Sequence, residues 1–265
     1  RVMSILANKF SEREKVKVHL ILIGRKRKIA YPLSDSITVY MPHFKFNNRR
    51  RLVDTIRTLL YHRRKVIKIN PDVVLSFGEM WNNLVLLSLF KSDIPVFISD
   101  RSEPGKDLGK LHNFLRNRLY PTATGYIAQT EEARQVCIKN KWNSNISVIG
   151  NPIRQIDINK NVERENIVLT VGRLIKTKHI DQLIKIFRDI NMEDWKLLIV
   201  GGDAKKQNLM KGLKSLVLDL QLEDVVFLEG RKENVDYYYN KSKIFAFTSS
   251  SEGFPNVVGE ALSAG

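Results

Sequence analysis

Cysteine is almost absent from this chain of 265 residues, in which Cys137 is the single thiol. One cysteine excludes a disulfide framework and a thiolate metal cluster, and we interpret Cys137 as a core or helix residue. Long apolar runs are also lacking. No run approaches the roughly 20 residues that a membrane-spanning helix needs, and the N-terminal stretch has no signal-peptide hydrophobic region. We therefore expect the protein in the cytosol or on a membrane surface.

Metal-binding patterns are missing as well. The chain contains no Asp-x-Asp motif, and His43, His62 and His112 do not have the spacing of metal ligands. Metal dependence is therefore not predicted. Apolar residues, in contrast, make up 43% of the chain, which is enough for hydrophobic cores and predicts a globular protein.

Positive charge is plentiful and unevenly distributed. The net charge is +16; residues 1–152 hold 27 Lys and Arg against 12 Asp and Glu, whereas residues 153–265 hold 17 against 16. The excess is concentrated in Arg25–Lys28, Arg49–Arg51 and Arg63–Lys65, followed by Lys106, Lys110, Arg116 and Arg118. Such a surface can be merely solvated, can face anionic lipid headgroups at about 1 kcal/mol per basic residue, or can bind nucleic acid. No recognisable nucleic-acid motif accompanies the basic runs.

Short apolar runs alternate with longer periodic segments, a pattern typical of a parallel sheet covered by helices. In the first part we predict strands near Val16–Ile23, Ile37–Met41, Val73–Phe77, Val96–Ser99, Gly125–Ala128 and Ile146–Ile149. The helices between them are predicted near Arg49–Lys68, Met80–Lys91, Leu108–Tyr120 and Glu131–Asn140. Gly150, Asn151 and Pro152 then break the pattern, and the polar stretch Gln155–Glu165 predicts a linker.

A second alternation follows the linker. Its strands are predicted at Ile167–Val171, Lys196–Val200, Val225–Leu228 and Ile244–Phe247, and its helices near Ile180–Ile190, Lys205–Leu220 and Val235–Asn240. The pattern indicates an α/β protein with two Rossmann-like domains, residues 1–152 and 153–265, whose parallel sheets face a cleft. Ligands of open α/β sheets bind beyond the carboxyl ends of the strands.

The most informative stretch is Ser249–Gly265, in which Glu252 and Glu260 stand eight residues apart across a turn that becomes a helix. A strand runs into a Ser-rich turn, and helical spacing of apolar residues restarts at Val257. Backbone N–H groups and the positive end of a helix dipole favour an anion such as a phosphate. Ionised glutamates accept hydrogen bonds, which suits sugar hydroxyls.

This pattern resembles the Glu-x7-Glu signature of the family 4 retaining glycosyltransferases, which have the GT-B fold. Val171–Phe187 resembles the strand, loop and helix that carry the family's Arg and Lys, and Ile199–Asp203 resembles its following strand end. Ile98–Pro104 and Val148–Ile153 are similar to segments of transferases that build bacterial surface polysaccharides. The resemblance also implies a fragment, because the family has a strand and a Gly-rich loop before this start and further strands and a long helix after Gly265.

The resemblance assigns roles to residues of the second domain. Arg173 and Lys178 match the residues that neutralise the donor diphosphate as it leaves, with Arg as a planar fork and Lys as a point charge. Glu252 matches the contact to hydroxyls of the transferred sugar, and Glu260 the contact to the nucleotide ribose. The remaining donor-binding residues are predicted to be Gly172, Gly201, Gly202, Gly253, Phe254, Pro255, Asn256 and Val257. The alternatives are a basic loop, solvated glutamates and ordinary turn glycines.

The first domain departs from the family pattern. Many relatives have a His after the fourth strand, whereas this chain has Arg101 at about that place. Arg101 can brace the diphosphate or bind the acceptor, or it can form a structural ion pair with Asp100 or Glu103. Glu79 also follows a strand end and is predicted to line the acceptor side.

The predicted function is transfer of a hexose or N-acetylhexosamine, with retention, from a nucleoside diphosphate sugar, with UDP favoured as the carrier. The predicted acceptor is a lipid-linked glycan in capsule or lipopolysaccharide biosynthesis, and no cofactor beyond the donor substrate is predicted. The basic first domain fits peripheral binding to the anionic inner face of the cell membrane. The alternatives are a non-catalytic basic protein that binds membrane or nucleic acid, and an epimerase or phosphorylase of the GT-B fold.

Overall fold

The structure, a computed structural model, describes residues 1–23, 29–159, 161–191, 193–204 and 207–265. The chain divides into two compact units, Arg1–Pro152 and Ile153–Gly265, each of which is described by itself. The basic run at Arg25–Lys28 lies outside the described residues. Among the helices that are described, none combines the length and the apolar character that crossing a bilayer requires.

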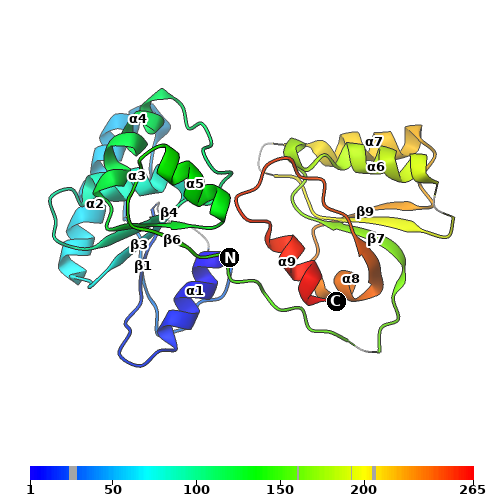
Figure 1. The fold of residues 1–265 in the computed structure, drawn as a ribbon, viewed down its shortest axis with the longest axis horizontal. Helices are drawn as coiled ribbons and strands as arrows, with labels where there is room; N and C mark the ends of the chain where they lie inside the picture. Colours follow the sequence, from blue (N-terminus) through cyan, green and yellow to red (C-terminus); the bar gives the residue numbers. More distant parts are fainter. Residues whose placement is uncertain (24–28, 160, 192, 205–206) are drawn as a thin grey trace. The chain divides into compact units, whose positions relative to one another are not determined.

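The first unit alternates parallel strands with helices (Figure 1). Its strands are β1 (His19–Ile21), β2 (Thr38–Tyr40), β3 (Val74–Phe77), β4 (Val96–Ser99), β5 (Gly125–Ala128) and β6 (Ile146–Val148). Its helices are α1 (Val2–Ser11), α2 (Arg51–Ile69), α3 (Glu79–Ser88), α4 (Lys110–Leu119) and α5 (Glu131–Lys139), with 3₁₀ turns η1 (Asn48–Arg50) and η2 (Tyr120–Thr122). Strand β1 pairs with β2, and the other four form a sheet in the order β3-β4-β5-β6.

Some predicted boundaries in this unit are wrong. The strand expected over Val16–Ile23 is paired only over His19–Ile21. The helix expected to reach Lys91 ends at Ser88, and Lys91 adopts a left-handed conformation with φ of 60° that cannot continue a helix. Helix α2 ends at Ile69 in the same way, since the next residue, Asn70, has a φ of 48°.

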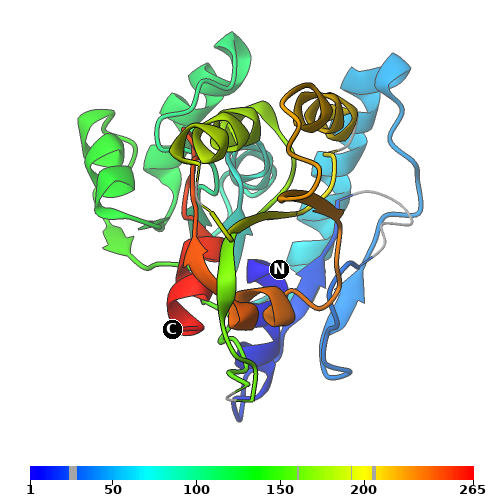
Figure 2. The ribbon, with the colours of Figure 1, turned by 90° about the vertical axis from the view of Figure 1, so that its right-hand side faces the viewer.

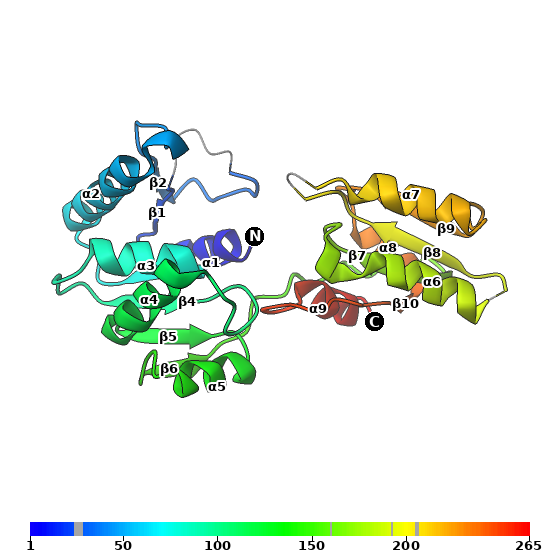
Figure 3. The ribbon, with the colours of Figure 1, turned by 90° about the horizontal axis from the view of Figure 1, so that it is seen from above.

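The core of the first unit is formed between the sheet and its helices. Helix α3 packs between α2 and α4 on one face of the sheet, and α1 lies on the other face (Figures 1 and 3). The ring of Tyr120 lies 5.7 Å from that of Trp142 and 6.1 Å from that of Tyr126, measured between centroids. Cys137 on α5 is fully buried among them, and burial raises the pKa of its thiol to about 11. The prediction that this thiol is a core residue is confirmed.

The second unit is a four-stranded parallel sheet, in the order β10-β7-β8-β9, with helices on both faces (Figure 2). Its strands are β7 (Glu165–Val171), β8 (Lys196–Val200), β9 (Val226–Gly230) and β10 (Ser242–Phe245). Its helices are α6 (Ile180–Ile190), α7 (Leu209–Asp219), α8 (Asp236–Lys241) and α9 (Asn256–Ser263), with the 3₁₀ turn η3 (Lys176–Lys178). In Figure 2, α6 and α7 lie above the sheet and α8 and α9 below it.

Alternate strand residues fill two separate cores. Val168, Leu197 and Ile199 pack under α6 and α7, whereas Leu169 and Leu198 pack toward α8 and α9. A sheet buried on both faces needs apolar residues at every position, which explains the unbroken apolar runs of the sequence. The sheet is thereby fixed in place, and the loops after its strands carry the polar residues.

The predicted start of α7 is wrong. The helix was expected from Lys205, but it begins at Leu209; residues 205 and 206 are outside the described part. The Asp203 carboxylate accepts hydrogen bonds from the N–H groups of Leu209 and Met210 at 2.7 and 3.0 Å. These bonds satisfy donors that a helix N-terminus leaves open, so Asp203 sets the start of α7.

The predicted linker over Gln155–Glu165 is wrong at both ends. Ile156 is 2% exposed and belongs to the core of the second unit, and Glu165 already begins β7. Arg154, just before it, forms a two-bonded ion pair with Asp236 on α8. Ile156 anchors this stretch, and the polar composition of the stretch gave no indication of that.

Candidate functional site

The ends of β7 and β8 approach each other through glycine backbone. A Cβ built on Gly201 would lie 1.6 Å from the carbonyl oxygen of Gly172, so no side chain fits at position 201. A Cβ on Gly202 would only reach ordinary contact, 3.6 Å from the Cβ of Arg231. The two predicted glycines thus differ, because the backbone contact requires Gly201 and leaves room at Gly202.

The loops that follow β7 and β10 meet. The Thr248 hydroxyl donates to the carbonyl of Lys178 at 2.6 Å, and the Ser250 N–H donates to the carbonyl of Thr177 at 2.9 Å. The imidazole Nε2 of His179 lies 2.8 Å from the Ser250 hydroxyl. These bonds join the loop after β7 to the loop after β10, although some 70 residues separate them in sequence.

Lys178 and Glu252 are brought together by this contact between loops. The ammonium and the carboxylate form an ion pair, and the ammonium also lies 5.1 Å from the centre of the Phe247 ring. Their side chains are 17% and 27% exposed, so the pair is reachable from solvent. A lysine held in this way can exchange its carboxylate partner for a phosphate oxygen, because both are anionic acceptors.

Arg173 lies on the same loop but in a different environment. Its side chain is exposed, and within the described part of the chain it makes no hydrogen bond or ion pair. The next residue, Leu174, is buried and continues the sheet through a bridge to Asp203. The structure therefore anchors the loop directly after a guanidinium that remains in solvent.

Glu260 projects from α9 into the second unit and is 2% exposed. The Tyr239 hydroxyl donates to its Oε2 at 3.2 Å. A Cβ on the neighbouring Gly259 would lie 2.7 Å from the Ile153 side chain, so glycine lets α9 pack closely against the start of the unit. A buried carboxylate needs hydrogen-bond partners, and Tyr239 is one that the sequence analysis did not identify.

Some N–H groups in and next to the turn before α9 already donate hydrogen bonds to the turn itself. The N–H of Asn256 donates to the carbonyl of Phe254 at 3.0 Å, and the N–H of Val258 donates to the carbonyl of Pro255 at 3.0 Å. Pro255, which precedes the first helical residue, has no N–H. Of the amides predicted to hold a ligand, that of Asn256 is therefore already engaged within the turn.

In the first unit, Glu79 holds the loop that follows β4. Its Oε1 accepts hydrogen bonds from the N–H groups of Arg101 and Ser102 at 3.0 and 2.7 Å. The side chain is 9% exposed at the first position of α3, where the helix dipole favours a carboxylate. Glu79 and Arg101 are thus brought together, with the carboxylate bonded to backbone.

The Arg101 guanidinium is held by an amide and a ring. It donates to the side-chain oxygen of Asn151 and lies 4.0 Å from the centre of the Phe77 ring. Burial lowers its pKa to about 10, against the opposing effect of Asp100 and Glu79. The ion pair with Asp100 considered as an alternative does not hold this side chain.

Asp100 instead turns into the core, which the sequence did not reveal. Its carboxylate accepts hydrogen bonds from Tyr120 at 2.6 Å, Asn82 at 3.0 Å and Tyr126 at 3.2 Å. Burial raises the pKa of Asp100 to about 6 although the tyrosine bonds act in the other direction. The partners come from three different elements, so no local sequence pattern indicates them.

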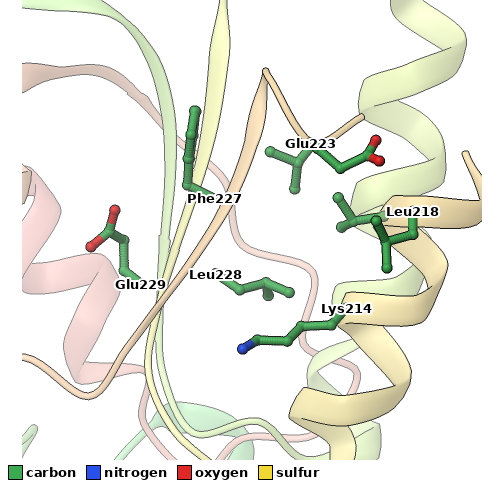
Figure 4. A pocket seen from close by; sticks show the side chains of 8 residues that line it. Lys214, Leu218, Glu223, Phe227, Leu228 and Glu229 are labelled. Carbon is green, nitrogen blue, oxygen red and sulfur yellow. The ribbon is translucent and has the colours of Figure 1, made fainter. Parts of the chain in front are cut away.

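Two other features of the described residues bear on ligands. No group of His, Cys, Asp and Glu in the part of the chain that is described has the arrangement of a metal site. An open pocket of about 430 Å³ lies between α7 and β9 and is lined by residues that include Lys214, Leu218, Glu223 and Phe227 (Figure 4). None of the predicted site residues lines it.

The second unit is similar to a known family of domains. Residues 153–265 match the family model described as glycosyl transferases group 1. These residues are therefore similar to group 1 domains. They contain Gly201, the Lys178–Glu252 pair and Glu260, so the described contacts of the second unit lie within the matched residues.

Several curated relatives of the chain are glycosyltransferases by name. An uncharacterized glycosyltransferase of Haemophilus influenzae is 35% identical over an alignment of 165 residues that covers 58% of this chain and 46% of the relative. The chain thus spans about half the length of that relative. A Campylobacter jejuni protein, named GalNAc-alpha-(1->4)-GalNAc-alpha-(1->3)-diNAcBac-PP-undecaprenol alpha-1,4-N-acetyl-D-galactosaminyltransferase, is 25% identical over 99% of this chain and 72% of its own length.

Solved structures show the fold. The lipopolysaccharide outer core galactosyltransferase WaaB matches with a TM-score of 0.73 and 18% identity over 99% of this chain and 73% of its own. HepE from Anabaena, solved in complex with UDP, matches with a TM-score of 0.68 and 16% identity over 86% of this chain and 66% of its own. The predicted α/β fold with parallel sheets, of the GT-B type, is confirmed.

Proposed function

We propose that this protein is a retaining glycosyltransferase that works without a metal ion. It moves a hexose or N-acetylhexosamine from a UDP-linked sugar to a lipid-linked glycan. Residues 153–265 bind the donor, and residues 1–152 bind the acceptor. Support comes from the names of its relatives, one of which combines an undecaprenol diphosphate with an N-acetylgalactosaminyl transfer, and from a structural neighbour solved with UDP.

The observation that carries the proposal is the Lys178–Glu252 ion pair at the carboxyl ends of β7 and β10. Open α/β sheets bind ligands at this edge. Donor diphosphate takes the place of the Glu252 carboxylate on the Lys178 ammonium, and Arg173, which is exposed on the same loop, supplies a second cation. Glu252 is then released to accept hydrogen bonds from hydroxyls of the sugar.

The other donor contacts follow from α9 and the glycine turn. Glu260 accepts a hydrogen bond from the ribose, and Tyr239 holds its carboxylate in place for that contact. Because Gly172 and Gly201 have no side chains, the diphosphate can pass close to the ends of β7 and β8. The amides of Gly253, Phe254 and Val257 at the start of α9 face the anion, which is where a helix N-terminus favours negative charge.

The transfer step needs no nucleophile from the protein. The bond from the sugar C1 to the phosphate oxygen breaks as the acceptor hydroxyl forms its bond to C1 on the same face. The hydroxyl proton passes to the departing phosphate oxygen. Lys178 and Arg173 stabilise the negative charge that develops on the diphosphate, which is the way cations assist a phosphate leaving group.

Calorimetric titration of UDP, GDP, ADP and uridine into the folded chain tests the donor site. Lys178→Ala is expected to weaken UDP binding about tenfold or more, as for a lost hydrogen bond to a charged group, and to leave uridine binding unchanged. Glu260→Gln is expected to weaken both ligands, since it acts at the ribose. Lys176→Ala removes a neighbouring exposed lysine of η3 and serves as the matched control.

Equal UDP affinities of wild type and Lys178→Ala would overturn the assignment of the diphosphate to this loop. Retention is tested separately, by assigning the anomeric configuration of the product by NMR. An inverted product, or turnover that requires a divalent ion, contradicts the proposed mechanism.

A further inference from the structure

Helix α2 has its polar side turned inward. The residues that it buries are spaced by one helical turn and are Asp54, Thr58, His62 and Val66. Residues at this spacing form one face of a helix. A helix on the surface of a protein ordinarily turns its apolar stripe to the core and its polar side to water, and here three of the four buried positions are polar.

Hydrogen bonds satisfy the polar groups on this inner face. The Asp54 carboxylate accepts from the N–H of Asn47 at 2.7 Å, the Thr58 hydroxyl donates to the carbonyl of Asp54 at 2.6 Å, and the His62 ring lies 2.7 Å from the Ser88 hydroxyl. Burial lowers the pKa of His62 to about 4, so the ring is neutral at pH 7. Because buried polar groups are stable only when bonded, these contacts fix the rotation of α2 about its axis.

The outer side of α2 therefore carries apolar residues. Leu52 is 83% exposed, and Val53, Ile56 and Leu60 are exposed next to it. On the neighbouring α4, Leu111 is 68% exposed, and Phe114 is also exposed. Soluble proteins leave large apolar surface exposed mainly where a partner or a membrane covers it.

An apolar pocket opens between the three helices. It has a volume of about 270 Å³ and is lined by side chains of α2, α3 and α4 together with Phe44 and Phe46. Helix α3 contacts both α2 and α4, so the three helices form one side of the unit (Figure 3). We call this side, formed by α2, α3 and α4, the three-helix face.

The charge of the three-helix face identifies its partner. The acidic residues of these helices are Asp54 and Glu79, and both are buried. The exposed charges of α2 and α4 are basic and include Arg51, Arg64 and Arg118. Exposed aliphatic and aromatic residues among cations, without exposed acids in the three helices themselves, complement a bilayer, whose phosphates lie above its hydrocarbon. A nucleic acid would match the cations but not the aliphatic residues.

We propose that the three-helix face docks on a bilayer that contains anionic lipids, with the exposed apolar residues of α2 and α4 inserted below the headgroups. The arginines of α2 contact lipid phosphates, and the apolar pocket takes part of a lipid chain. The inference rests on the geometry of the first unit; it deepens the proposed function, because a lipid-linked acceptor is presented in the same bilayer.

Vesicle sedimentation tests the docking. The chain is mixed with vesicles of phosphatidylcholine, or of phosphatidylcholine and phosphatidylglycerol at about 7:3, a mixture whose anionic headgroups attract basic residues. The variant Leu52→Ser/Val53→Ser/Ile56→Ser is expected to lose binding to the anionic vesicles at least tenfold, while circular dichroism shows an unchanged fold. The matched control, Ile186→Ser/Ile190→Ser/Leu218→Ser, changes exposed apolar residues of the second unit and is expected to bind like wild type.

Salt separates insertion from electrostatic attraction alone. Residual binding of the wild type at 0.5 M NaCl that disappears in the α2 variant supports insertion, because screening removes purely ionic contacts. Equal binding by wild type and the α2 variant, or tighter binding of a single-stranded oligonucleotide that is indifferent to the α2 substitutions, overturns the proposal. UDP titration of the same variant is expected to match the wild type, so failure of docking and failure of the donor site are distinguishable.

Discussion

Helices α2 and α6 are both amphipathic, yet they are held to their sheets by opposite means. The buried side of α6 is wholly apolar and consists of Ile180, Leu183, Ile184 and Phe187. The buried side of α2 consists of Asp54, Thr58, His62 and Val66. Helix α6 is thus stabilised by removal of apolar surface from water, and α2 by hydrogen bonds that are specific in position. The comparison shows that the face of a helix with more apolar residues need not be its inner face.

The largest effect is expected from truncation on the inner side of α6. Phe187→Ala is expected to lower the free energy of unfolding by about 3–5 kcal/mol, because it removes buried apolar area and leaves a cavity. Ile186→Ala, on the exposed side of the same helix, is expected to change it by less than about 0.5 kcal/mol. Urea denaturation followed by circular dichroism measures both. A cost below about 1 kcal/mol for Phe187→Ala would show that α6 does not depend on burial.

Acidification is expected to separate the inner side of α2 from that of α6. Burial lowers the pKa of His62 from 6.5 to about 4, so the unfolded chain binds the proton more readily between these values. His62 therefore costs about 3 kcal/mol of stability as pH falls through this window. His62→Asn is expected to lose that much less stability than wild type between pH 6.5 and pH 4, whereas the penalty of Phe187→Ala stays constant.

Asp100 has the opposite effect on how stability depends on pH. Burial raises its pKa from 3.8 to about 6, so the folded chain binds the proton more readily, and stability from this group is lost as pH rises. Asp100→Asn is expected to lose about 3 kcal/mol more than wild type on acidification from pH 6 to pH 4. Urea midpoints measured across this range provide the test. Parallel pH profiles of the two variants and wild type would contradict both assignments.

A smaller effect is expected from a substitution in the first turn of α2. Asp54→Ala leaves the N–H of Asn47 without its acceptor and is expected to cost about 1–3 kcal/mol. Leu52→Ala, on the outer side, is expected to cost less than about 0.5 kcal/mol despite the larger apolar group removed. Thermal unfolding of the two variants reports the order. If Leu52→Ala were the more destabilising, the rotation of α2 described above would be wrong.

The sequence predicted the strands of the two sheets well because parallel strands buried on both faces are apolar throughout. The strands Val96–Ser99, Gly125–Ala128 and Lys196–Val200 have the predicted bounds. Segment ends were predicted less well, because they depend on single contacts such as the capping of α7 by Asp203. The apolar spacing of Leu52, Ile56 and Leu60 indicated a helix but gives no means of seeing that this face points outward.

Parts of the candidate site could be predicted because they are local. Glu252, Glu260 and Lys178 are set by a loop and a helix start, and the structure adds that Lys178 and Glu252 form an ion pair. The partners Tyr239 and Asn151 could not be predicted, since each comes from an element distant in sequence. The roles assigned to the site residues stay predictions until ligand binding is measured.

The buried thiol of Cys137 has a practical consequence for these experiments. A thiol with no exposed surface and a pKa near 11 has little thiolate at neutral pH, and thiolate is the form that reacts with maleimides. A cysteine introduced at an exposed position of α2 is then the sole reactive one, and the native residue can stay in place. Fluorophores or spin labels attached one position at a time would report which side chains leave water when vesicles are added, and to what depth each of them goes.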